Sequence, residues 1–213
     1  MAKKKELILI VGGTGFIGFH LINFLKKKGF SIVSLSTKRP KLRRVIKGIK
    51  YLICDISNKK NLNKLKSFQF DHVVNLGGYV DHTNKKKTFL SHYNGVKNLS
   101  DIFIKNQIKS FIQMSSGGEY GSINSPHKEN YINKVRSTST YYYAKSLATK
   151  LLIKLYRKRN FPVTVLRLYQ TYGPNQEVNR FLPVLITNCL KNRKFPTSHG
   201  KQFRDFIYIS DLI

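Results

Sequence analysis

A tyrosine and a lysine four residues apart, Tyr141 and Lys145, are the first residues of this sequence whose spacing points to chemistry. On a helix, two residues at this spacing lie on the same face. A nearby ammonium group favours the phenolate and lowers the pKa of the tyrosine, so that the phenol can exchange a proton with a substrate oxygen. Ser116 follows a short apolar run and is placed to hydrogen-bond the same oxygen. We therefore predict Tyr141, Lys145 and Ser116 as catalytic residues.

A glycine-rich turn directly follows the first apolar run of the chain, Leu7–Val11. It reads Gly12-Gly13-Thr14-Gly15-Phe16-Ile17-Gly18 and opens an amphipathic segment. Missing side chains let a backbone turn tightly and approach a pyrophosphate, whose charge is met by the N-terminus of the following helix. Neither this turn nor a Tyr–Lys spacing is by itself specific for a function. Their occurrence in this order in one chain supports both the predicted phosphate site and the predicted catalytic pair. The predicted pyrophosphate contacts are Gly12, Gly15, Phe16, Ile17 and Gly18.

The end of the second apolar run bears on the choice of dinucleotide. Chains that bind NAD usually carry Asp or Glu about 20 residues after the glycines, where it holds the ribose 2′-hydroxyl. This sequence has no acidic residue there and instead carries Ser36, Thr37, Lys38 and Arg39. Small hydroxyls followed by two cations suit a 2′-phosphate, so we predict NAD(P) as the cofactor, with a leaning to NADP(H). The alternative is that Lys38 and Arg39 belong to a general excess of lysine and arginine.

Short apolar runs alternate with helix-length segments along the chain. This alternation predicts an α/β fold with a doubly wound, Rossmann-like parallel sheet, which binds ligands at the carboxyl ends of its strands. The glycine turn and Ser116 both fall at such ends. The predicted strands are Leu7–Val11, Ser31–Leu35, Tyr51–Cys54, His72–Leu76, Phe111–Met114 and Val163–Leu168. The predicted helices are Phe16–Lys28, Asn58–Lys66, Thr88–Asn106 and Thr140–Arg159.

The composition narrows the class of protein and its partners. Hydrophobic residues make up 41% of the 213 residues, as in globular domains, and no apolar run reaches the length of about 20 residues needed to cross a bilayer. The apolar run after Glu6 is too short for a signal peptide, so we expect a cytoplasmic protein with no membrane partner. Cys54 and Cys189 lack metal-ligand spacing, and we expect reduced thiols and no metal.

The formal net charge of +29 is the unusual feature of the composition. Such a field attracts anions, including phosphorylated substrates and nucleic acid. The lysines are spread along the whole chain, however, and no Arg-rich tract or recognition motif accompanies them. We therefore do not expect nucleic acid as a partner.

Taken together, these motifs resemble the extended short-chain dehydrogenase/reductase family, in its NAD-dependent epimerase/dehydratase group, from Leu7 to the last residue. The glycine turn is similar to the signature turn of the family, and Tyr141 with Lys145 matches its catalytic pair. The resemblance implies further cofactor contacts at Asp55 and Ile56, and at Leu76, Gly77 and Gly78.

The resemblance also implies a nucleotide-diphosphate sugar as the substrate, with hydride transfer at sugar C4. Tyr141 is then the acid/base, Lys145 lowers its pKa and holds the nicotinamide ribose, and Ser116 orients the sugar oxygen. In the family, the arginine that corresponds to Arg204 holds the nucleotide diphosphate, since a guanidinium grips phosphate oxygens in a fork. The implied substrate contacts are Ser116, Gln170, Asn179 and Arg204.

Departures from the family pattern bear on the type of reaction. Family dehydratases of the glucose 4,6 type carry Asp-Glu just after the active-site hydroxyl residue, where this chain has Gly117 and Gly118, with Glu119 one residue late. Dehydration is therefore disfavoured. An NADP(H)-leaning site favours a 4-ketosugar reductase, whereas a 4-epimerase keeps its cofactor and usually prefers NAD. His92 replaces a family Asn that supports the lysine, so it is either part of the proton relay or a packed or solvated histidine.

The resemblance also shapes the expected organisation of the chain. We expect an NAD(P)-binding domain over 1–174 and an incomplete substrate-binding portion over 175–213, since family members continue for about a hundred residues, one domain at the usual size. The family implies a homodimer through a bundle of the helices Thr88–Asn106 and Thr140–Arg159. Two alternatives stay open, namely a reductase or isomerase of a non-nucleotide substrate and a non-enzymatic, RNA-binding protein of the same fold.

Overall fold

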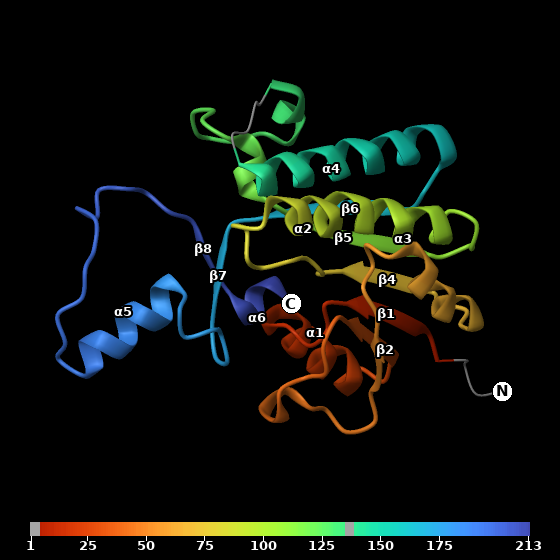
Figure 1. Cartoon of the computed structure of the whole chain (residues 1–213), viewed down its shortest axis with the longest axis horizontal. Helices are drawn as coiled ribbons and strands as arrows, with labels where there is room; N and C mark the ends of the chain where they lie inside the picture. The colour runs from red at the N-terminus through yellow and green to blue at the C-terminus, as the bar shows by residue number, and fades with distance from the viewer. Residues whose placement is uncertain (1–4, 135–138) are drawn as a thin grey trace. The chain divides into compact units, whose positions relative to one another are not determined.

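The computed structural model describes residues 5–134 and 139–213 (Figure 1). The chain divides into two compact units, Met1–Leu168 and Tyr169–Ile213. Within the described ranges, no helix is both long and apolar enough to cross a membrane.

The first unit contains a six-stranded parallel sheet in the order β3-β2-β1-β4-β5-β6. The strand order runs outward from β1 in both directions, so the topological switch lies between β1 and β4. This is the doubly wound, Rossmann-like arrangement, and the predicted fold class is confirmed. The strands are β1 (Leu7–Val11), β2 (Ser31–Ser36), β3 (Lys50–Ile53), β4 (His72–Asn75), β5 (Ser110–Ser116) and β6 (Val163–Leu168).

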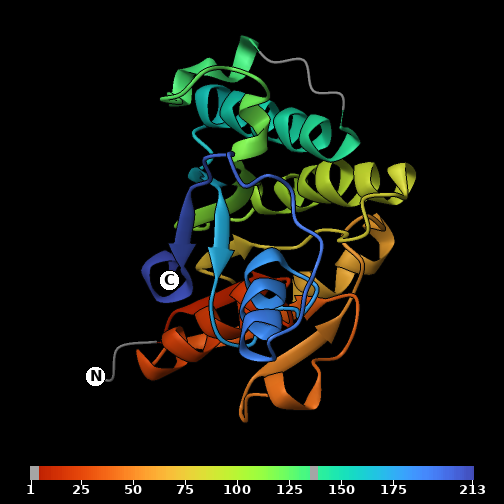
Figure 2. The same ribbon diagram turned by 90° about the vertical axis from the view of Figure 1, so that its left-hand side faces the viewer.

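Hydrophobic residues cover both faces of this sheet. Alternate residues of a strand point to opposite faces, and β1 divides its side chains accordingly. Leu9 and Val11 join the core cluster that contains residues of α3 (Gly95–Phe103) and α4 (Thr140–Arg159). Ile8 and Ile10 join a second cluster with α1 (Phe16–Lys27). Figures 1 and 2 show α3 and α4 together on one side of the sheet and α1 on the other.

One expected helix is divided in the structure. The segment predicted as Thr88–Asn106 begins earlier, as α2 (Lys85–Phe89), and ends at Phe103 in α3. Between them lies a π-helical turn, η3 (Leu90–Asn94). The apolar period continues through this turn, so the pattern cannot reveal it, although π turns occur frequently at functional sites. His92 lies in this turn.

The remaining helical segments of the first unit are short and of the 3₁₀ type. The predicted helix Asn58–Lys66 is one of them, with Asn58 as its cap rather than its first residue. The short segments are η1 (Leu42–Arg44), η2 (Lys59–Ser67), η4 (Gly117–Tyr120) and η5 (Glu129–Lys134).

The second unit has its own small parallel ladder of β7 (Gln170–Tyr172) and β8 (Phe206–Tyr208). The helices of this unit are α5 (Phe181–Leu190) and α6 (Ile209–Leu212). The last residues of the chain thus form a short strand followed directly by a helical turn. The sequence pattern did not predict β7 or α5, since three residues are too few for a periodicity and α5 buries none of its side chains.

Candidate active site

The glycine turn connects β1 to α1 and closes tightly on its neighbours. Gly12 adopts a φ of 81°, which favours glycine, and a Cβ there would lie 2.9 Å from the backbone nitrogen of Gly77 after β4. A Cβ on Gly18 would lie 2.5 Å from the carbonyl oxygen of Gly12. These two glycines are therefore required by the packing of the turn itself.

Gly15 has a different environment from the other glycines of the turn. A Cβ on Gly15 would meet only the carbonyl oxygen of Gly12, at 3.2 Å. Gly15 is the N-cap of α1, where no side chain caps the helix and no acidic residue lies in the first turn, which starts with Phe16 and Ile17. The N-terminus of a 12-residue helix thus presents its amides without a side-chain cap. This arrangement fits the pyrophosphate of a dinucleotide.

The residues after β2 differ in how they lie toward the turn. Ser36 is buried, and its Oγ accepts a hydrogen bond from the Thr14 amide at 3.3 Å. The other three predicted 2′-phosphate contacts, Thr37, Lys38 and Arg39, are exposed. Arg44, which the sequence analysis did not single out, is only 3% exposed and donates from a guanidinium nitrogen to the Thr14 carbonyl oxygen at 3.3 Å. No sequence signal distinguishes Arg44 from the many other cations of the chain.

The segments after β3 and β4 reach the same edge of the sheet. Asp55 is exposed and accepts from the Ser57 amide at 2.8 Å, whereas Ile56 is buried in the core. The half-buried Leu76 packs on the cluster beneath α1. A Cβ on Gly77 would lie 2.8 Å from a Val11 methyl group.

Gly78 lies against the imidazole ring of His92. A Cβ on Gly78 would lie 2.6 Å from His92 Nδ1 and would overlap the ring. The absence of a side chain at Gly78 therefore makes room for the His92 ring.

Lys145 is almost fully buried, on α4, next to β5. Its Nζ donates to the Met114 carbonyl oxygen at 2.7 Å and lies 5.8 Å from the centroid of the Tyr141 ring. Burial disfavours the charged ammonium and lowers the pKa of Lys145 to about 8, while the Glu119 carboxylate acts in the opposite direction. The predicted Tyr–Lys pair is thus brought together, with the lysine held by the strand that ends in Ser116.

The Tyr141 ring lies between two histidines. His82 stacks on it at a centroid distance of 4.0 Å, and His92 meets it edge-on at 4.8 Å. His92 is buried, and its Nε2 lies 3.1 Å from the Tyr79 carbonyl oxygen, so Nε2 is the donor. Burial and the nearby Lys145 charge lower the pKa of His92 to about 3, which keeps the ring neutral. His92 is therefore a packed neighbour of Tyr141 and not a solvated residue.

Ser116 is the last residue of β5 and the N-cap of η4. Its Oγ accepts from the Gly118 amide at 3.2 Å. A Cβ on Gly118 would overlap the ring of Tyr142, which packs over this turn. The turn after Ser116 is thus covered by a tyrosine of α4.

Glu119 points into the core and forms the centre of a buried polar network. It is 2% exposed and accepts hydrogen bonds from Ser115 Oγ and, at 2.9 Å, from Thr149 Oγ1. Arg167 Nε lies 3.2 Å from its other carboxylate oxygen. The carboxylate thus joins β5, α4 and β6 and is enclosed by these partners.

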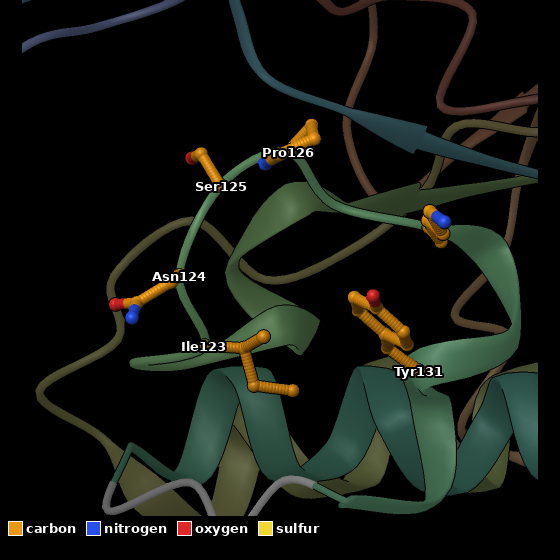
Figure 3. Close-up of a pocket in the computed structure, with 6 residues that line it drawn as sticks. Ile123, Asn124, Ser125, Pro126 and Tyr131 are labelled. Atoms are coloured by element: carbon orange, nitrogen blue, oxygen red, sulfur yellow. The ribbon is translucent and has the colours of Figure 1, made fainter.

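A pocket lies in the segment that follows η4. It is lined by Ile123, Asn124, Ser125, Pro126, Lys128 and Tyr131 (Figure 3). None of the predicted cofactor, catalytic or substrate residues lines it. The candidate site is therefore identified from the strand ends and α4 rather than from this pocket.

Three predicted substrate contacts belong to the second unit. Gln170 starts β7, and its amide donates to the Asp205 carbonyl oxygen at 3.2 Å. Arg204 is exposed and donates to the Phe203 carbonyl oxygen at 3.0 Å. Asn179 is exposed just before α5. Gln170 thus pairs with Asp205, the residue that follows Arg204, at the start of the small ladder.

The sheet order and the glycine turn after β1 define a Rossmann-like α/β protein. A sequence model of the NAD dependent epimerase/dehydratase family matches residues 8–213, and the chain belongs to this family. The resemblance drawn from the sequence motifs is therefore confirmed.

Curated relatives agree with this assignment. The chain is 30% identical to dTDP-D-glucose 4,6-dehydratase of Dictyostelium discoideum, over all of this chain and 56% of the relative. It is 26% identical to CDP-abequose synthase of Salmonella typhimurium, over all of this chain and 69% of the relative. The chain thus spans only part of the length of these relatives.

Two solved structures share the fold. UDP-glucose 4-epimerase of Thermotoga maritima, determined with UDP-glucose, matches with a TM-score of 0.88 and 23% identity, over 97% of this chain and 70% of that one. dTDP-glucose 4,6-dehydratase of Bacillus anthracis, in complex with NAD, matches with a TM-score of 0.84 and 22% identity, over 97% of this chain and 69% of that one.

Proposed function

We propose that this protein is an NAD(P)-dependent oxidoreductase that transfers hydride at C4 of a nucleotide-diphosphate sugar. The observation that carries the proposal is the Tyr141–Lys145 pair, with Lys145 buried and held by β5, in a member of the epimerase/dehydratase family. When bound, the nicotinamide supplies or accepts the hydride. The curated relatives act on dTDP-, CDP- and UDP-linked sugars according to their names, which supports a substrate of this class.

The residues of the site divide the remaining work. The Tyr141 hydroxyl gives a proton to the sugar O4 as the carbonyl is reduced, or takes it in the reverse direction. The Lys145 ammonium stabilises the phenolate and holds the nicotinamide ribose. Ser116 donates a hydrogen bond to the sugar oxygen and so orients C4. The amides at Phe16 and Ile17 bind the pyrophosphate, which Gly15 leaves room for, and Arg204 takes the phosphates of the sugar nucleotide.

The turn after Ser116 favours simple oxidation and reduction over dehydration. A dehydratase needs a group that removes the C5 proton, and Gly117 and Gly118 have no side chain to do so. The Tyr142 ring fills the space that a side chain at Gly118 would need, and Glu119 is engaged in the core. The site therefore supports a reductase or an epimerase.

Cofactor choice favours the 4-ketosugar reductase between these two. Ser36 stands where an NAD-binding chain usually has an acid, and the buried Arg44 lies beside it on Thr14. A reductase exchanges its cofactor every turnover and commonly uses NADPH. The second candidate is a 4-epimerase, an activity that the name of a curated relative from Pisum sativum includes.

The test is cofactor use by the full-length protein. We expect it to purify with little bound dinucleotide and to oxidise NADPH when given 4-keto nucleotide sugars, while Tyr141→Phe does not. Tightly bound NAD that co-purifies, with no net oxidation, would contradict the reductase and favour the epimerase. If Arg204→Ala leaves the Michaelis constant for nucleotide sugars unchanged, the substrate class itself is wrong.

We also propose a homodimer through α3 and α4. Tyr156 of α4 is 58% exposed and Tyr143 is 50% exposed, which leaves aromatic surface on this helix. Light scattering of the purified protein tests the proposal, and a monomer at micromolar concentration would contradict it.

A further inference from the structure

One acidic side chain is buried beside the Tyr141–Lys145 pair. The sequence has 10 acidic residues, all of them within the described ranges, and only Glu119 is buried, with 2% of it exposed. A carboxylate is almost never fully buried unless it is paired. Glu119 lies in η4, which follows Ser116 directly, yet no step of the proposed reaction uses it. Its burial therefore needs a reason other than contact with the substrate.

The two oxygens of the Glu119 carboxylate face different elements. Oε1 accepts hydrogen bonds from Ser115 Oγ on β5 and, at 2.9 Å, from Thr149 Oγ1 on α4. Oε2 lies 3.2 Å from Arg167 Nε on β6. Arg167 also donates from Nη1 to the Tyr120 hydroxyl at 2.9 Å. The carboxylate thus joins α4 to the two strands on which this helix packs.

Both partners of Oε1 lie next to the groups that hold Lys145. Ser115 follows Met114, whose carbonyl oxygen accepts from Lys145 Nζ at 2.7 Å. Thr149 lies four residues after Lys145 on α4, so the two side chains share a face of the helix. Thr149 Oγ1 also lies 3.4 Å from Ser115 Oγ. Lys145 and Thr149 therefore attach α4 to two consecutive residues of β5.

Ionisable groups around Lys145 come from four elements. Tyr141 lies one turn before it on α4, and His92 of η3 is neutral because burial lowers its pKa to about 3. Arg167 of β6 is the ion-pair partner of Glu119. Burial lowers the pKa of Lys145 to about 8, and the Glu119 carboxylate of η4 acts in the opposite direction. Glu119 is thus the anion that favours a charged Lys145.

We propose that Glu119 is a positioning residue for Lys145. It joins α4 to β5 on either side of the ammonium group, and its carboxylate balances the charge of that buried group. A neutral or displaced Lys145 does not stabilise the Tyr141 phenolate, so the loss of Glu119 affects the reaction through Lys145. The inference rests on the proposed function in taking Tyr141 and Lys145 as the catalytic pair.

A double-mutant cycle on stability tests the charge balance without catalysis. Glu119→Gln, Lys145→Met and the double variant of the full-length protein are unfolded in urea at pH 7. Without the carboxylate the buried ammonium group is more destabilising, so its removal should stabilise more. We expect Lys145→Met to raise the urea midpoint by about 0.5 M more in the Glu119→Gln background than in the wild-type protein. The effect on Arg167 is common to both backgrounds and cancels.

The pH profile of the reaction separates positioning from a general loss of structure. Removal of a nearby anion makes it easier for Lys145 to lose its proton. In Glu119→Gln, the alkaline limb of kcat/KM should therefore move to lower pH by about one pH unit. A purely structural loss lowers kcat/KM by the same factor at every pH.

Matched variants complete the test. Glu119→Asp keeps the charge and should return the alkaline limb close to its wild-type position. Glu129→Gln removes an exposed carboxylate and should leave both the limb and the cycle unchanged. If Glu119→Gln does not fold, every measurement is repeated with Arg167→Met in all variants, which removes the guanidinium left without its carboxylate.

The outcomes distinguish this inference from the proposed function. Additive urea midpoints, or an alkaline limb that Glu119→Gln does not move, would overturn the role of Glu119 even in an active reductase or epimerase. The expected non-additive midpoints in a protein that converts no nucleotide sugar would support the link between Glu119 and Lys145 and contradict the proposed reaction.

Discussion

The glycine turn and the Tyr–Lys site lie at the same edge of one sheet but depend on different chemical groups. The turn presents backbone amides, and its shape depends on missing side chains at Gly12 and Gly18. The Tyr–Lys site instead gathers ionisable side chains that are almost fully buried, Lys145, His92 and Glu119. The first region should therefore be sensitive to added volume and the second to changed charge.

This contrast has an energetic reason. A backbone amide at a helix N-terminus has no hydrogen-bond partner within its helix. A ligand can therefore bind this amide without breaking an existing contact. A buried charge, in contrast, loses its hydration whether or not a ligand is present. The buried charges of the Tyr–Lys site thus lower the free energy of unfolding even without a ligand, whereas the glycine turn has no such effect.

The largest expected effect is the loss of the phenol at the Tyr–Lys end. Tyr141→Phe should lower the turnover number of the full-length enzyme by about 10³-fold, in the range of general acid–base catalysis. Dinucleotide affinity should change less than about 3-fold, because the phosphate-binding turn is unaltered. Steady-state kinetics and cofactor titration measure the two effects. Tyr143→Phe, at an exposed position of the same helix, is the control, and an equal loss there would contradict the assignment.

The buried network should give the next largest effect. Glu119→Ala leaves the Arg167 guanidinium without its carboxylate, and breaking a buried pair in this way costs about 3–5 kcal/mol of unfolding free energy. Urea unfolding measures the loss. Glu129→Ala removes an exposed carboxylate and should stay within about 0.5 kcal/mol. Similar losses for both would show that Glu119 does not hold β5, α4 and β6 together.

Removing the buried lysine should raise stability while it abolishes activity. Burial lowers the pKa of Lys145 from 10.5 to about 8, so the unfolded chain binds this proton more tightly than the folded one. The cost is fully present below pH 8 and disappears as the pH rises through 10.5. Lys145→Met should therefore stabilise the fold by about 1–3 kcal/mol at pH 7. Unfolding at pH 7 and at pH 10 should show this gain shrink, and a gain that is constant with pH would contradict the cause.

Substitutions in the glycine turn should give the smallest of the four effects. Two of its glycines should differ, one affecting mainly stability and the other mainly dinucleotide binding. Gly18→Ala places a methyl group 2.5 Å from the Gly12 carbonyl oxygen and should cost about 1–3 kcal/mol of stability. Gly15→Ala should cost less than about 1 kcal/mol. It should nevertheless weaken dinucleotide binding about 10-fold, because under the proposed function its methyl group would stand where the pyrophosphate approaches. Thermal unfolding and fluorescence titration with NADPH measure both. If Gly15→Ala binds as tightly as the wild type, the ligand does not approach there.

The site residues that the sequence predicted are those whose proposed role depends on local spacing. The glycine turn, the Tyr141–Lys145 pair and Ser116 at a strand end need only the period of a strand or a helix to be placed. The sequence named His92 and Glu119 without deciding their surroundings, and it did not single out Arg44. Arg44 meets Thr14 across 30 residues, and Glu119 meets Thr149 across 30. No local pattern separates a buried arginine from an exposed one in so basic a chain.

The sequence by itself thus determined the class of fold, the six strands and the positions of the phosphate turn and the Tyr–Lys pair, because hydrophobic period and glycine placement act over a few residues. The tertiary structure alone decided which charges are buried. It turned Glu119 into the core, packed His92 on Tyr141 and brought Arg44 to the glycine turn. Burial depends on contacts between distant segments, and the chemistry of an ionisable group follows from its burial.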